Sequence, residues 1–168
     1  DAETADVAIK AALTGHLVFS TLHTNSAPSV VTRLVDMGVE RYLIAATLRL
    51  AVAQRLVRRL CARCRRERDM LPSEAAALGN PAAAGAAVYE PAGCLYCANR
   101  GLVGRLGLFE MLPVDEALSR RIADGADEGE IVSEIGRRGV PRLVDDALEK
   151  IRGGQTTVQE VLTAVTVW

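Results

Sequence analysis

All four cysteines of the chain fall in two pairs of the same form, Cys61-x-x-Cys64 and Cys94-x-x-Cys97. Two such pairs can present four thiolates to one tetrahedral ion, and zinc favours an all-sulfur shell. Shared ligation would bring both ends of the intervening segment to one point, which restricts the fold more than any other feature of the sequence. We therefore predict a structural zinc site, because four cysteines leave no coordination position for a substrate water.

Two other uses of these cysteines stay open at this point: a pair of disulfides, or a redox-active CxxC. Disulfides are rare in cytoplasmic proteins, and a redox pair needs one accessible CxxC on a thioredoxin-like frame. Arginines lie close in sequence to the cysteines, at positions 58, 59, 63, 65, 66 and 100. Their positive charge would favour thiolates and offset the negative charge of a four-thiolate zinc centre.

A second informative stretch is residues 14–25, which read TGHLVFSTLHTN. Its apolar run over 17–21 predicts a buried strand of a parallel sheet. Thr21, His23, Thr24 and Asn25 would then emerge at the carboxyl end of that strand, where open α/β sheets bind ligands.

Two histidines occur in the chain, His16 before this predicted strand and His23 after it. Both could be ordinary polar residues that bound a strand. The polar neighbours of His23 favour a functional role for that residue, whereas His16 stays open between the two readings.

The composition supports a core but gives no attraction towards nucleic acid. Hydrophobic residues make up 49% of the chain, aromatic residues 4%, and the net charge is −1. Seven arginines fall between Arg55 and Arg68, with no aromatic residue among them to stack on a base. A solvated face or a contact to a protein partner explains them better. We expect no nucleic-acid partner and, without a run of about 18 apolar residues, no transmembrane segment.

Hydrophobic periodicity and helix-end signals predict helices with a few strands between them. Asp127-x-x-Glu130 and Thr157-x-x-Glu160 are capping-box patterns, and Gly139 and Gly153 are placed for C-terminal caps. Helices are predicted over 1–13, 26–37, 42–48 and near 73–78, and from near Asp115, Asp127, Pro141 and Thr157; strands are predicted over 17–21 and within 101–110. Residues 50–60 could continue the helix over 42–48 or form a strand.

Several segments, in the right order, resemble the secretion ATPase family, which comprises the hexameric motors of type II secretion and their relatives in type IV pilus assembly. Residues 14–25 resemble its histidine box, and the opening residues 1–5 resemble the end of its Walker B segment, GEIRDxETA. Residues 53–61 resemble its AQRLVRxLC segment, and residues 101–110 its GYxGRxGxxE element. Asp36-Met37-Gly38-Val39-Glu40 also matches.

The resemblance implies an α/β fold class: the C-terminal part of a RecA-like P-loop ATPase core, with a tetracysteine zinc-knuckle insertion and a C-terminal helical subdomain. It implies a partial core over 1–60, the zinc-binding element and return to the core over 61–111, and the helical subdomain over 112–168.

The resemblance also implies roles for particular residues around ATP and Mg²⁺. His23, with Thr21 beside it, would contact the γ-phosphate side, and Asp1 would belong to the Walker B region near Mg²⁺. Arg105, Arg33 and His16 are expected near the nucleotide. An alternative for Arg105 is a structural pair with Glu110.

One departure from the family pattern is the absence of a Walker A loop, GxxxxGK[ST], from these 168 residues. Neither of the two lysines, Lys10 and Lys150, follows a glycine, so this chain cannot build the phosphate-cradling loop. We therefore expect the chain to be the C-terminal part of a longer ATPase, beginning within Walker B and inactive alone.

For the full-length protein the resemblance implies a cytoplasmic motor, peripherally associated with the inner membrane. It would form a homo-oligomer, expected to be a hexameric ring, and contact inner-membrane secretion platform proteins. The alternatives are a type IV pilus assembly ATPase, a non-enzymatic zinc-ribbon binding module, or a purely structural fragment.

Overall fold

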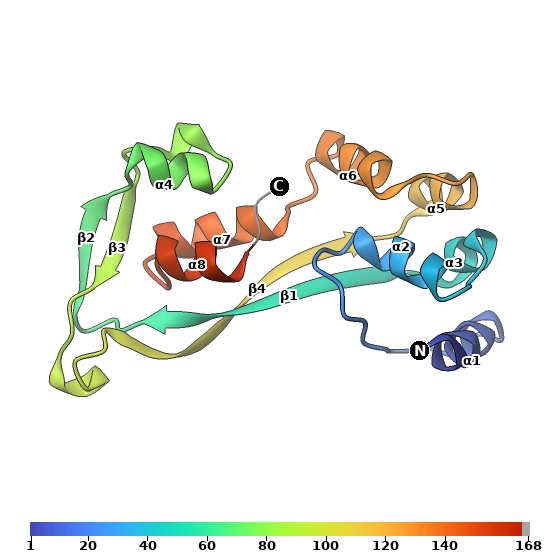
Figure 1. Ribbon diagram of the computed structural model, residues 1–168, viewed down its shortest axis with the longest axis horizontal. Coiled ribbons are helices and arrows are strands. Elements are labelled where there is room, and N and C mark those ends of the chain that lie inside the picture. The colour runs from blue at the N-terminus through green and yellow to red at the C-terminus, as the bar shows by residue number, and fades with distance from the viewer. Residues whose placement is uncertain (166–168) are drawn as a thin grey trace. The chain divides into compact units, whose positions relative to one another are not determined.

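The computed structural model describes residues 1–165 and has a mixed α/β fold, as predicted (Figure 1). Helices precede, interrupt and follow two long strands, which pair with each other, and a shorter pair of strands lies between them in the sequence. The elements in chain order are α1 (Ala2–Leu13), α2 (Ser29–Asp36), α3 (Arg41–Thr47), β1 (Leu50–Leu60), β2 (Arg65–Asp69), α4 (Pro72–Ala77), η1 (Pro81–Ala83), β3 (Ala87–Pro91), η2 (Leu95–Cys97), β4 (Leu102–Pro113), α5 (Glu116–Ala123), α6 (Glu128–Arg137), α7 (Leu143–Arg152) and α8 (Val158–Ala164).

The chain divides into two compact units, each with its own hydrophobic core. Unit 1 comprises Asp1–Ala53 and Glu110–Pro141, and unit 2 comprises Gln54–Phe109 and the chain from Arg142 onward. The three-part division at residues 60 and 111 stays a prediction, and the last three residues of its helical part lie outside the described residues.

The core of unit 1 is built from helix faces whose apolar residues recur at helical spacing. In α5 and α6 the buried pairs are four residues apart, Leu118 with Ile122 and Ile131 with Ile135, so each pair lies on one face of its helix. Ile44 of α3 is fully buried among them. Burying each such side chain contributes roughly 1.5–3 kcal/mol, which is why these helices form as the sequence predicts.

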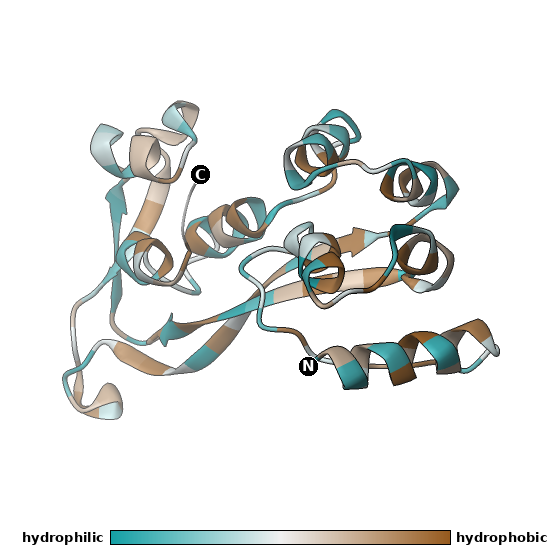
Figure 2. Cartoon of the chain, turned by 45° about the vertical axis from the view of Figure 1, so that its right-hand side comes forward, coloured by the Kyte–Doolittle hydropathy of each residue, from teal (hydrophilic) through white to brown (hydrophobic). Residues whose placement is uncertain are grey.

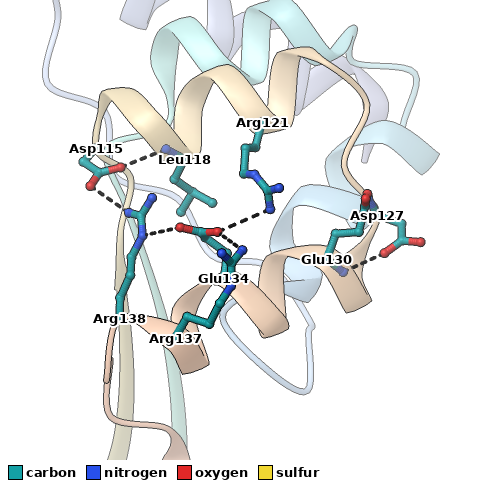
Figure 3. Close-up of polar contacts among 8 residues, drawn as sticks. All are labelled: Asp115, Leu118, Arg121, Asp127, Glu130, Glu134, Arg137 and Arg138. Atoms are coloured by element: carbon teal, nitrogen blue, oxygen red, sulfur yellow. Dashed lines mark hydrogen bonds and ion pairs between the residues drawn. The ribbon is translucent and has the colours of Figure 1, made fainter.

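Charged side chains join α5 to α6 in unit 1 (Figure 3). Glu134 lies 2.7 Å from Arg138 Nε and 3.3 Å from an Arg121 nitrogen, and it also pairs with Arg137. Arg138 reaches the Asp115 carboxylate at 2.8 Å. Because Asp115 is the N-cap of α5, this network links the start of α5 to the end of α6.

The core of unit 2 combines α7 and α8 with the short strands and α4. Met70, Val88, Leu108 and Ile151 are almost fully buried in one cluster. The strands β2 and β3 form an antiparallel pair in which Arg65 is opposite Pro91. Neither strand was predicted, because the sequence of β2, RRERD, has no apolar residue to alternate with its charges.

The helix N-termini largely follow the sequence signals. The Asp1 carboxylate accepts the Thr4 N–H at 2.8 Å and caps α1. The Asp127 capping box is complete, because Asp127 accepts the Glu130 N–H and Glu130 accepts the Asp127 N–H. Only half of the Thr157 box forms, since Thr157 accepts the Glu160 N–H but the Glu160 side chain binds Arg58.

Both glycines predicted at helix C-termini lie there. Gly139 has φ +66°, as a C-terminal cap residue requires. Gly153 is the C-cap residue of α7, as predicted, with φ −70°, and the next residue, Gly154, lies in the left-handed region with φ +62°.

The predicted buried strand over 17–21 was wrong for the described residues. Residues 16–24 form neither helix nor strand, and the side chains of Leu17 and Phe19 are 84% and 87% exposed. A strand needs a neighbour to receive its backbone hydrogen bonds, and the strand pairs of the described chain are β1 with β4 and β2 with β3. The segment runs instead beside α1, whose surface alternates between hydrophilic and hydrophobic bands next to the N label in Figure 2.

Candidate metal centre and histidine segment

The two CxxC pairs form two tight turns at the ends of long strands. Cys61 follows the end of β1, and its backbone N–H donates to Gly101 O at 2.9 Å, beside the start of β4. In the first turn the N–H of Arg65 donates to Cys61 O at 3.1 Å. In the second, the N–H of Asn99 donates to Cys94 O at 2.8 Å. Because β1 and β4 pair with each other, the end of β1 lies beside the start of β4, and both cysteine pairs meet there.

The four sulfur atoms lie close together, and three of their separations match those around a tetrahedrally coordinated ion. All lie within 4.8 Å of one another. Cys61 Sγ is 3.9 Å from Cys94 Sγ, and Cys64 Sγ is 3.8 Å from Cys97 Sγ. Zinc bonded to four sulfurs at ~2.3 Å places those sulfurs about 3.8 Å apart. The four cysteines could therefore hold one metal ion, and all four are free thiols rather than disulfides.

Without a bound ion, the thiols of Cys97 and Cys64 differ in how readily they ionise. Burial opposes ionisation of Cys97, but hydrogen bonds from the backbone N–H groups of Cys94 and Gly101 outweigh it and lower its pKa to about 6. Burial and hydrogen bonds with Cys61 and Cys97 raise the pKa of the Cys64 thiol to about 12. Four thiolates in this space need a cation among them, as a zinc site supplies.

Backbone conformation around the second turn depends on glycine. Gly101 has φ +69°, and a Cβ added there would lie 2.2 Å from Pro91 Cβ and 2.9 Å from Pro91 Cα. Its N–H donates to Cys97 Sγ at 3.1 Å. Gly93 has φ +91°, and a Cβ there would lie 2.9 Å from Asn99 O. These glycines let the backbone approach closely enough to place the sulfurs.

Much of the arginine run is engaged in unit 2 rather than available to a ligand. Arg58 pairs with Glu160, and Arg68 pairs with Glu74. Arg65 donates to Gly154 O at 2.5 Å. The guanidinium groups of Arg65 and Arg63 also stack on Tyr89 and Tyr96, at 4.8 and 4.2 Å from the ring centroids. This arrangement favours a structural role for the run, and the expectation of no nucleic-acid partner stays a prediction.

The predicted nucleotide-side residues of unit 1 lie on or next to α1 and α2. The His16 Nδ1 atom lies 3.0 Å from Thr14 Oγ1 and 3.2 Å from Ala11 O, at the end of α1. Thr21 and His23 are exposed in the segment without regular structure, and Arg33 is exposed on α2. Their contacts with a nucleotide stay predictions, as does that of Asp1.

Arg105 and Glu110 lie on opposite faces of β4. Arg105 is exposed, whereas Glu110 is buried beside Leu108 and Leu112, which alternate with it along the strand. The Glu110 carboxylate accepts the backbone N–H of Ala27 at 3.0 Å. Sequence reasoning treated Glu110 as a partner for Arg105 and missed this contact, although the alternation of β4 signals its burial.

Comparison with known proteins decides the family. A family model described as "Type II/IV secretion system protein" matches residues 1–163. The chain belongs to this family. It is 43% identical over 162 residues to type II secretion system protein E of Aeromonas hydrophila, covering 96% of this chain and 32% of that protein. It is 41% identical over 165 residues to the type IV pilus assembly ATPase PilB of Myxococcus xanthus, covering 96% and 29%.

The fold is similar to that of the pilus retraction motor PilT, solved with bound ADP. The TM-score is 0.64 at 20% identity, and the match covers 97% of this chain and 36% of the PilT chain. This family member thus spans about a third of the length of its curated relatives. Within residues 1–165 no helix combines the length and apolar character needed to cross a bilayer.

Proposed function

We propose that this family member is the C-terminal part of a motor that hydrolyses ATP to drive type II protein secretion. The observation that carries the proposal is the family match along residues 1–163, with relatives named as secretion and pilus assembly ATPases. Hydrolysis would require a phosphate-binding loop that these 168 residues do not contain, so activity is assigned to the full-length protein.

His23 and Thr21 are the residues we assign to the γ-phosphate side of the nucleotide. Both are exposed polar side chains that precede the anchored start of α2. Asp1 is assigned to the Mg²⁺ side, Arg33 and Arg105 to positive charge near the nucleotide, and His16 to a position near the nucleotide. Phosphoryl transfer to water depends on positioned charge rather than on covalent chemistry, which suits residues of these types.

Zinc is the ion we assign to Cys61, Cys64, Cys94 and Cys97. The sulfur separations and the all-cysteine donor set support it. Four protein ligands leave no coordination position for a reacting water. The ion would therefore have a structural role and stabilise the fold of residues 61–97.

The full-length protein would act as a homo-oligomeric ring, six-membered by family resemblance, on inner-membrane platform proteins from the cytoplasmic side. A type IV pilus assembly ATPase is the nearest alternative, and identities of 41% and 43% to members of the two groups do not separate them. A free-standing zinc-ribbon module is less well supported, because the family match extends through both cores.

The proposal is tested by phosphate release from ATP and zinc content, both measured on the purified full-length protein. We expect hydrolysis, about one zinc per chain, and a kcat about 10²-fold lower in His23→Ala. Arg120→Ala, an exposed change on α5, is the matched control and should hydrolyse ATP normally. A wild-type protein without hydrolysis, or a His23→Ala protein with normal kcat, would contradict it.

Secretion and pilus assembly are separated by genetic complementation. The full-length gene should restore protein export to a strain that lacks its type II secretion ATPase. Restoration of pilus extension alone, in a strain that lacks its pilus assembly ATPase, would favour the alternative.

A further inference from the structure

Glu110 is a buried carboxylate that the proposed mechanism does not use. It is 5% exposed, and among the residues that the structure describes it is the only aspartate or glutamate buried in a core. Its neighbours on the same face of β4 are Leu108 and Leu112. Burial of a carboxylate is costly unless a donor compensates it, so its position calls for a partner.

That partner is the turn at which α2 begins. Glu110 Oε2 accepts the Ala27 N–H at 3.0 Å, and Ala27 is itself fully buried. The first turn of α2 contains no acidic residue, and its N-cap residue makes no side-chain bond to the helix. A carboxylate at this end both satisfies a backbone donor and complements the helix dipole. Glu110 thus supplies, from 83 residues away, the acidic group that the first turn of α2 lacks.

Three further contacts hold the same turn. Ser26 Oγ lies within hydrogen-bond distance of Ser29 Oγ at 3.1 Å and of Glu128 Oε1 of α6 at 3.3 Å. Ser29 Oγ donates to Ser26 O at 2.8 Å. The turn is therefore anchored to β4, α6 and α2, whereas residues 16–24 before it have no regular structure. His23 lies only three positions ahead of this fixed point.

We propose that Glu110 is a positioning residue that orients the His23 segment through the Ala27 N–H. The inference rests on the proposed ATPase function, in which His23 acts beside the phosphates. Glu110 contributes the fixed end of the segment, while contact with the nucleotide belongs to His23. Because a misplacement of ~1 Å can lower a rate by roughly 10²-fold, loss of this anchor should appear in kcat.

The test uses ATP hydrolysis by the full-length protein with four variants. Glu110→Ala and Glu110→Asp both withdraw the acceptor, and each should lower kcat about tenfold or more with the KM for ATP within about twofold. Glu110→Gln keeps an oxygen at the same reach and should stay within about threefold of wild type. Glu116→Ala, which removes an exposed glutamate of α5, is the matched control and should not change kcat.

A double variant tests whether Glu110 acts through His23. If it does, Glu110→Ala combined with His23→Ala should be no slower than His23→Ala alone. Losses that multiply would overturn the inference, as would a normal kcat in both Glu110→Ala and Glu110→Asp.

Amide hydrogen exchange on the same proteins gives a readout that needs no ATPase activity. In Glu110→Asp, exchange should accelerate at Ala27 and over residues 21–26, while Ile131 and Ile135 of α6 keep their protection. Unchanged exchange at Ala27 would overturn the inference. A wild-type protein that does not hydrolyse ATP would refute the proposed function, and the exchange result would still decide whether Glu110 anchors the segment.

Discussion

The carboxylate of Glu160 accepts hydrogen bonds from both the side chain and the backbone of Arg58. Its two oxygens each lie 3.0 Å from Arg58 Nε, and Oε2 lies 3.1 Å from Arg58 N. These bonds lower the pKa of Glu160. In unit 2 they tie the first turn of α8 to β1, so that a side chain placed to cap its own helix instead joins two elements.

Removal of the Glu160 carboxylate should destabilise unit 2. Glu160→Ala would leave the Arg58 N–H without this acceptor and is expected to lower the midpoint of thermal unfolding by about 2–5 °C. Gln159→Ala, at the exposed neighbouring position, is the control and should leave the midpoint unchanged. Equal midpoints for both variants, measured by circular dichroism, would show that the pair contributes nothing.

The network around Glu134 and Asp115 should make the stability of unit 1 depend on acid. A hydrogen bond from Arg138 lowers the pKa of Glu134 from its usual 4.5. The Leu118 N–H and Arg138 lower the pKa of Asp115 from 3.8. Stability from these carboxylates is therefore full above their usual pKa values and is lost as the pH falls through the lowered values in the folded protein.

Glu134→Gln should accordingly flatten the fall in unfolding free energy below pH 4.5, relative to wild type. Urea titrations at a series of pH values measure this. Glu116→Gln, whose carboxylate is exposed, should follow the wild-type curve. A Glu134→Gln curve that is parallel to wild type at low pH would refute the assignment.

Metal content should depend on the sulfurs and not on the exposed side chains between them. Cys97→Ser is expected to reduce zinc well below one ion per chain, because a serine hydroxyl is a poor zinc ligand. Leu95→Ala changes a side chain that is 94% exposed within the same turn and should retain the metal. Elemental analysis of the dialysed proteins provides the comparison, and full occupancy in Cys97→Ser would argue against a four-sulfur site.

Gly101 and Gly104 should differ in their tolerance of alanine. Both have positive φ, so either substitution carries about 1–2 kcal/mol of backbone strain. Only the Gly101 Cβ would collide with Pro91, since nothing lies within 4 Å of a Cβ at Gly104. Gly101→Ala should therefore lower both stability and zinc retention by more than Gly104→Ala. Similar losses for the two variants would mean that the contact with Pro91 can relax.

Where a segment carries its own periodicity or cap, the sequence sufficed to predict it. Leu118 and Ile122 share a helix face, and Asp127 pairs with Glu130 across one turn, so α5 and α6 follow from contacts within a few residues. The cysteine site was equally accessible, because two matched CxxC pairs can share an ion whatever the fold between them.

The failures occur where the deciding partner is far away in the sequence. The apolar run from Leu17 suits a strand, but a strand also needs a paired neighbour, and the described residues provide none for it. Glu160 matches the capping pattern, yet Arg58 competes for its carboxylate from 102 residues away. The contact between Glu110 and Ala27 depends on burial that only the assembled strand and helices create.

The segment between the cysteine pairs is constrained in two ways. The four cysteines cluster at its two ends, and its Met70 and Val88 share a hydrophobic core with Leu148 and Ile151 of α7. An ion that binds only the folded form stabilises whatever unfolds together with its ligands, by an amount that grows with free ion concentration relative to Kd. If the four cysteines bind zinc as proposed, the stability of helix α7, which contributes no ligand, would be linked by mass action to the supply of metal. The availability of zinc around the protein would thus set the fraction of molecules in which these C-terminal helices are folded.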